Sequence, residues 1–124
     1  MGNNELQNEG ARIVALVLDL MFGARVRGAA PDAVLARSPE TLMEAVGPST
    51  RLVLVDLQAP GATAALESLG DRREGVKVVA WGPHVMEDAL EAAREAGADQ
   101  VLPRGAFVRA LPGLVAEATA GTET

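Results

Sequence analysis

The 124-residue chain is long enough for one domain of ordinary size and too short for two. It is 48% hydrophobic and 2% aromatic, which is typical of a globular chain, and the absence of cysteine excludes disulfides and thiolate metal sites. The net charge of −6 disfavours binding to nucleic-acid phosphates, which requires clustered Lys and Arg. No apolar run is long enough to cross a membrane, and the polar first ten residues do not resemble a secretory signal. We therefore expect a cytoplasmic domain.

Short apolar runs alternate along the chain with segments of helical spacing. The runs predict strands at residues 13–18, 33–36, 52–55, 76–81 and 101–102. Three of these runs are apolar throughout except for Lys77, which is typical of strands that helices cover on both faces. The alternation predicts five βα units and therefore a doubly wound parallel sheet.

The intervening segments carry helix start and stop signals. They predict helices at residues 21–30, 39–46, 62–69 and 83–96, and a last helix within 107–118. Ser38 is a candidate N-cap with Pro39 at the first helical position, and Pro112 should kink or restart the last helix. We expect one domain with flexible ends, divided as a 1–10 arm, an 11–118 domain and a 119–124 tail.

In doubly wound sheets, ligands bind beyond the carboxyl ends of the strands. The candidate functional residues at these ends are Asp19, Asp56, Gly82, Pro83, His84 and Arg104. Trp81, by contrast, ends an apolar run and is expected in the core.

Three segments resemble a known family when they are taken in order. Residues 53–58, VLVDLQ, followed by Pro60-Gly61, resemble the third strand and phosphoacceptor loop of bacterial response-regulator receiver domains. Residues 88–99, DALEAAREAGAD, are similar to the fourth helix and following turn of that family, and residues 16–19, LVLD, to the end of its first strand. The resemblance covers nearly all of residues 11–118. It implies a flavodoxin-like three-layer α/β/α fold with strand order 2-1-3-4-5.

The resemblance also implies a site for phosphoryl transfer. Asp56 stands at the phosphoacceptor position, and Asp19, Asp56 and the backbone carbonyl of Gln58 stand at the positions that hold Mg²⁺. A divalent ion is needed there because the phosphate and the carboxylate are both anionic.

Four positions depart from the family pattern. Leu20 replaces the second acid beside Asp19, Gly82 replaces a Thr or Ser, Arg104 replaces a Lys, and Val101 replaces the switch aromatic. Leu20 should weaken Mg²⁺ binding because it offers no oxygen ligand. Gly82 lacks the hydroxyl that contacts the phosphoryl group in the family, and Arg104 differs from Lys in the reach of its positive charge. Together they indicate a degenerate pseudo-receiver.

Three functions remain open. We favour a stand-alone, non-enzymatic signalling domain that works without phosphorylation and binds a protein, or a second copy of itself, through its fourth helix, fifth strand and fifth helix. The first alternative is a Mg²⁺-dependent phosphoacceptor response regulator that uses Asp56. The second is a sensor of small anionic ligands that uses Gly82, His84 and Arg104. His84 also fits a solvated loop residue, and Arg104 is expected to pair with Asp56 or Asp19 and close the site.

Overall fold

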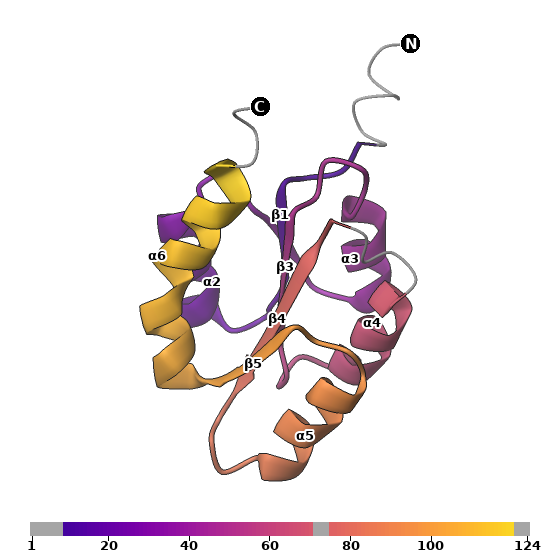
Figure 1. Cartoon of the computed structure of the whole chain (residues 1–124), viewed down its shortest axis with the longest axis vertical. Coiled ribbons are helices and arrows are strands. Elements are labelled where there is room, and N and C mark those ends of the chain that lie inside the picture. The colour runs from indigo at the N-terminus through magenta and orange to yellow at the C-terminus, as the bar shows by residue number, and fades with distance from the viewer. Residues whose placement is uncertain (1–8, 71–74, 121–124) are drawn as a thin grey trace.

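The computed structural model describes residues 9–70 and 75–120. Most of the expected arm at residues 1–10 and tail at residues 119–124 lies outside the described residues. Strands and helices alternate along the described chain (Figure 1). The elements are β1 (Ile13–Leu16), α2 (Leu20–Ala29), β2 (Val34–Ala36), α3 (Pro39–Ala45), β3 (Leu52–Asp56), α4 (Ala62–Leu69), β4 (Lys77–Gly82), α5 (Glu87–Glu95), β5 (Gln100–Pro103) and α6 (Arg104–Ala120).

The five strands form one parallel sheet in the order β2-β1-β3-β4-β5, which confirms the predicted topology. Helices α2 and α6 cover one face of the sheet, and α3, α4 and α5 cover the other (Figure 1). Side chains alternate between the two faces along each strand. In β3, for example, Leu54 joins the core beneath α2 and α6, whereas Val53 and Val55 join the core beneath the other three helices.

The few aromatic side chains gather on the α2 and α6 face. The rings of Trp81 and Phe107 stack with centroids 4.0 Å apart and planes at 4°, and Phe22 packs against both. Trp81 is only 1% exposed, which confirms its predicted place in the core. This cluster lies directly beneath the carboxyl end of β4.

The expected start of the helix after β4 at Pro83 is wrong. Residues 83–86 form a turn, in which the Met86 amide donates to the Pro83 carbonyl oxygen at 2.9 Å, and α5 begins only at Glu87. The fixed φ of proline suits both a first helical position and a β-turn, so the sequence alone does not separate the two.

The last helix, expected to kink or restart at Pro112, does not restart there. Helix α6 begins at Arg104, directly after β5, and continues without restarting to Ala120. Pro112 itself is exposed. The helix is held by a buried stripe that packs on the sheet and comprises Phe107, Leu111, Leu114, Val115 and Ala118. Burial of this stripe outweighs the local cost of the proline.

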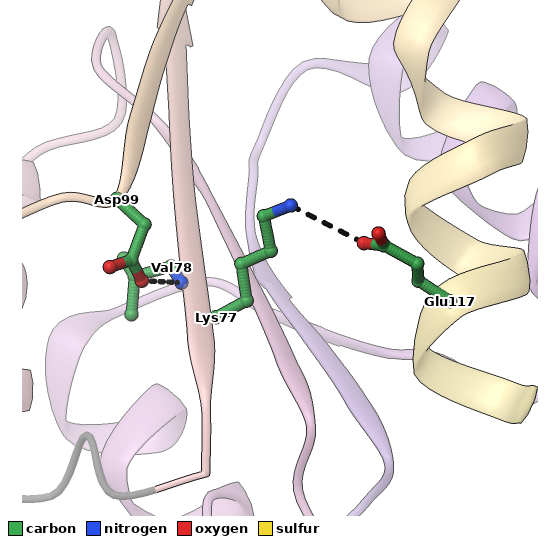
Figure 2. Close-up of polar contacts among 4 residues, drawn as sticks. All are labelled: Lys77, Val78, Asp99 and Glu117. Carbon is green, nitrogen blue, oxygen red and sulfur yellow. Dashed lines mark hydrogen bonds and ion pairs between the residues drawn. The ribbon is translucent and has the colours of Figure 1, made fainter. Parts of the chain in front are cut away.

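Two polar contacts hold the amino-terminal end of β4 (Figure 2). The backbone amide of Val78 donates to Oδ2 of Asp99 at 2.8 Å, and Nζ of Lys77 lies 3.3 Å from Oε1 of Glu117 on α6. These contacts lie at the opposite edge of the sheet from the candidate site. No helix within the described ranges is long and apolar enough to cross a bilayer.

Candidate functional site

Four of the candidate residues come together at the carboxyl edge of the sheet. In the strand register, Asp56 on β3 lies beside Trp81 on β4, and Gly82 lies beside Pro103 on β5, directly before Arg104. Asp19 follows β1, the other neighbour of β3. The topology therefore brings two carboxylates and one guanidinium to the same corner, as the sequence predicted.

Asp56 is almost completely buried, with 4% of its surface exposed. Its Oδ1 atom accepts a hydrogen bond from the backbone amide of Gln58 at 2.9 Å. Burial raises the pKa of Asp56 above its ordinary value; the Gln58 amide opposes this shift, the charge of Asp19 adds to it, and the charge of Arg104 opposes it. Burial therefore destabilises the charged form of Asp56 more than the Gln58 amide and Arg104 stabilise it.

Arg104 does not form the ion pair that the sequence led us to expect. Its Nη2 atom donates to Oε1 of Gln58, and its guanidinium carbon lies 5.8 Å from the centre of the Phe22 ring. Of the ion pairs among residues 9–70 and 75–120, none joins Arg104 to Asp56 or Asp19. A guanidinium can lie over the face of an aromatic ring while its N–H groups donate elsewhere, and these two contacts engage Arg104 without a carboxylate. We call this contact the Gln58–Arg104 clasp.

Asp19 has a structural task that sequence reasoning missed. Its Oδ1 atom accepts from the backbone amide of Phe22 at 3.0 Å and so caps the first turn of α2. An Asp immediately before a helical segment is a recognised N-cap signal, so this role could have been found in the sequence. The next residue, Leu20, is 86% exposed and supplies no oxygen where receivers carry a second acid.

The residues at this corner offer Mg²⁺ only a small number of protein ligands. Asp19, Asp56 and the backbone carbonyl of Gln58 would hold the ion, and each carboxylate has one oxygen already engaged by a backbone amide. Across the described ranges, no group of three or more His, Cys, Asp or Glu side chains is arranged to hold a metal. Mg²⁺ keeps several waters in protein sites, so two carboxylates suffice for weak binding. A bound ion would neutralise charge beside Asp56.

Gly82 and His84 lie in different environments. Gly82 is buried, and a Cβ atom placed on it would lie 3.4 Å from Cβ of Leu57, which is ordinary contact. A larger side chain there would therefore meet Leu57. His84 is exposed in the turn between β4 and α5. Arg104, the third residue of the anion-sensor hypothesis, is already engaged in the clasp.

Comparison with known proteins gives a clear result at the level of structure alone. No protein-family model matches the sequence, and no curated protein matches it. The receiver domain of NtrX from Brucella abortus superposes with a TM-score of 0.71 at 18% identity, over 87% of this chain and 98% of that domain. A receiver domain protein from Clostridium thermocellum gives 0.72 at 15% identity, over 91% of this chain and 97% of that one.

The Mn²⁺-bound form of response regulator Rcp1 is a further neighbour, with a TM-score of 0.67 at 15% identity over 86% of this chain and 92% of that one. Against the whole NtrX chain, the match spans 28% of that protein. These likenesses, together with the strand order, show that the chain has the flavodoxin-like fold of response-regulator receiver domains.

Proposed function

We propose that the chain is a receiver-type signalling domain of the two-component kind that acts by binding protein partners without being phosphorylated. One observation carries this proposal: the groups that a phosphoacceptor needs at the carboxyl edge are already engaged with the chain itself. The clasp holds Arg104, the N-cap contact holds Asp19, and burial encloses Asp56.

The chemistry of phosphoryl transfer makes these contacts an obstacle. The acceptor carboxylate must be reached by a phosphodonor, and a cation and a divalent ion must neutralise the charge that develops. Arg104 donates to Gln58 and lies over the Phe22 ring rather than pairing with Asp56. Both side chains of the clasp are exposed, so this contact favours the unmodified state by only about 1 kcal/mol.

A partner would bind on the face formed by α5, β5 and α6. Strand β5 is an edge strand whose residues Gln100 to Leu102 are only half-buried. The exposed side of α5 is strongly acidic and carries Glu87, Asp88, Glu91 and Glu95. This surface suits a partner with basic side chains.

The second candidate function is a Mg²⁺-dependent phosphoacceptor. It is favoured by the position of Asp19, which follows β1, the strand next to β3, and whose charge contributes to the raised pKa of Asp56. The Mn²⁺-bound neighbour Rcp1 shows that this fold accommodates a divalent ion. In this chain, the ion would lower the repulsion between the two carboxylates.

Mass spectrometry of the intact protein after incubation with acetyl phosphate and Mg²⁺ separates the two functions. We expect no added phosphoryl group on the natural sequence. Addition that disappears in Asp56→Asn would overturn the proposal and make the phosphoacceptor function correct. A matched variant, Leu20→Asp with Arg104→Lys, restores the second acid and the lysine and should gain a phosphoryl group under the same conditions.

A further inference from the structure

Exposed apolar side chains gather at the carboxyl edge of the sheet. Four large hydrophobic side chains are exposed within the described ranges, and three of them lie at this edge: Leu20 at 86%, Met21 at 68% and Val85 at 75%. Large apolar side chains grouped on one surface mark an interaction site more often than scattered ones do. Leu20 lines the first of two features at this end of the sheet, and Val85 belongs to the second.

The first feature is a cavity of about 240 Å³ beside the start of α2. Its apolar wall includes Leu18, Leu20 and Leu35. Two cations, Arg27 and Arg37, and one carboxylate, that of the α2 N-cap Asp19, complete its charged lining. We call this cavity, with its two arginines, the α2 socket.

A glycine keeps the α2 socket open. Gly23 lines the cavity, and a Cβ atom added to it would lie only 3.3 Å from Cδ1 of Leu35. Both arginines are exposed, and no ion pair among the described residues satisfies either of them. The socket therefore offers apolar walls and an excess of positive charge, two guanidinium groups against the one carboxylate of Asp19, to an occupant.

The second feature is the turn that joins β4 to α5. Val85 projects from this turn, and the first turn of α5 carries the exposed carboxylates of Glu87 and Asp88. The turn stands at the same end of the molecule as the carboxyl ends of the strands (Figure 1). We call Val85, Glu87 and Asp88 the α5 knob.

We propose that the α2 socket of one copy of this chain receives the α5 knob of a second copy. The two features are complementary, because an apolar side chain flanked by carboxylates meets an apolar cavity flanked by guanidinium groups. Each molecule carries both features at one edge. A two-fold axis between facing edges therefore forms both contacts at once and closes the assembly as a dimer.

The dimer has a consequence for the candidate site. Asp56 lies on β3, and in the sheet β1 and β3 separate the socket strand β2 from the knob strand β4. Facing copies would therefore cover the edge where Asp56 ends its strand. The net charge of −6 on each copy opposes association at long range, but salt screens such repulsion beyond about 8 Å at physiological ionic strength. The short-range attraction between the arginines of the α2 socket and the carboxylates of the α5 knob then decides whether the dimer forms.

Sedimentation velocity over a concentration series tests the proposal with paired charge reversals. The socket variant is Arg27→Glu with Arg37→Glu, and the knob variant is Glu87→Lys with Asp88→Lys. We expect the natural chain to form dimers, each variant alone to be monomeric, and an equimolar mixture of the two to form dimers again, because both contacts of the mixed dimer then join opposite charges.

Matched controls change equal charge outside the two features. Arg25→Glu with Arg109→Glu should leave the dimer intact, and so should Glu40→Lys with Glu44→Lys, since all four side chains are exposed elsewhere. Circular dichroism checks that every variant is folded.

A neutral change, Val85→Ser, tests the apolar part of the contact. It should raise the dissociation constant about tenfold or more, since it removes one buried Val from each contact. A monomeric natural chain at every concentration, or a charge-reversed mixture that stays monomeric while its components are folded, would overturn the dimer. Neither outcome bears on phosphorylation.

Discussion

The carboxyl group of Asp56 is the one buried acid in the described part of the chain, and its surroundings do not fully stabilise its charge. The Gln58 amide and the charge of Arg104 favour the ionised form, but burial and Asp19 disfavour it more strongly. Its pKa is therefore higher in the folded protein than in the unfolded chain. Folded protein binds the proton more tightly, so stability falls as the pH rises through the folded pKa.

Replacing Asp56 with Asn should therefore stabilise the protein at neutral pH. The amide removes the buried charge, and its oxygen can still accept the hydrogen bond from the Gln58 backbone. The gain should shrink as the pH is lowered and Asp56 becomes protonated in the natural chain. Thermal unfolding of both proteins from pH 4 to pH 8 measures this difference. A lower melting temperature for the variant at neutral pH would contradict the argument.

The stacked pair of Trp81 and Phe107 is the largest aromatic contact in the core. Truncating Phe107 to Ala should lower the free energy of unfolding by about 3–5 kcal/mol, because the cavity cannot be refilled by rigid neighbours. Phe107→Leu keeps most of the apolar volume and should cost less. Urea titration followed by the fluorescence of Trp81, the single tryptophan, gives both values. Equal losses in the two variants would show that stacking, rather than filled volume, stabilises this region.

At the scale of elements, helix ends were predicted best where a local signal acts alone. Helix α3 begins at Pro39 with Ser38 as its N-cap, and the Ser38 hydroxyl accepts from the Thr41 amide at 3.1 Å, as the sequence indicated. Helix α4 has the predicted bounds of Ala62 and Leu69. Helix α6 differs because tertiary packing overrides the signal at Pro112.

The proline in α6 should therefore be a measurable local cost. Pro112→Ala allows a backbone hydrogen bond toward Val108 and removes the ring from the helix interior, so the free energy of unfolding should rise by about 1–3 kcal/mol. The neighbouring change Gly113→Ala is the matched control, since a Cβ there meets nothing within 4 Å. It should add about 1 kcal/mol or less through helix propensity alone. If urea titration showed the larger gain for Gly113→Ala, the proline would not be strained.

At the scale of the whole molecule, the two edges of the sheet have different tasks. The carboxyl edge gathers the candidate site, the α2 socket and the α5 knob. At the amino ends of the strands, polar contacts join the start of β4 to Asp99 and to Glu117 on α6 (Figure 2). Because these stabilising contacts lie at the amino ends of the strands, the loops at the carboxyl ends are available for binding.

The two amino-edge contacts should differ in strength. The Lys77 and Glu117 side chains are 38% and 70% exposed, so Glu117→Gln should cost less than about 1 kcal/mol of unfolding free energy. Asp99→Ala removes the acceptor of the Val78 amide and should cost about 1–3 kcal/mol, because that donor belongs to a buried strand residue. Urea unfolding of both variants checks the order. A larger loss for Glu117→Gln would contradict it.

The sequence by itself determined the alternation of strands and helices, the burial of both sheet faces and the residues that end each strand. These features depend on local patterns: continuous apolar runs, caps, and glycine or proline at element ends. Because parallel strands align their carboxyl ends, the pattern also placed Asp19, Asp56, Gly82 and Arg104 at one edge.

Only the tertiary structure decided what those side chains contact. Arg104 lies over the Phe22 ring and donates to Gln58, although both are distant in sequence, and no local pattern encodes that choice over a carboxylate. The same holds for the continuity of α6 through Pro112 and for the α2 socket, which exists because Gly23 on a helix faces Leu35 on a strand. Each depends on packing between separate elements, where burial and geometry outweigh local preference.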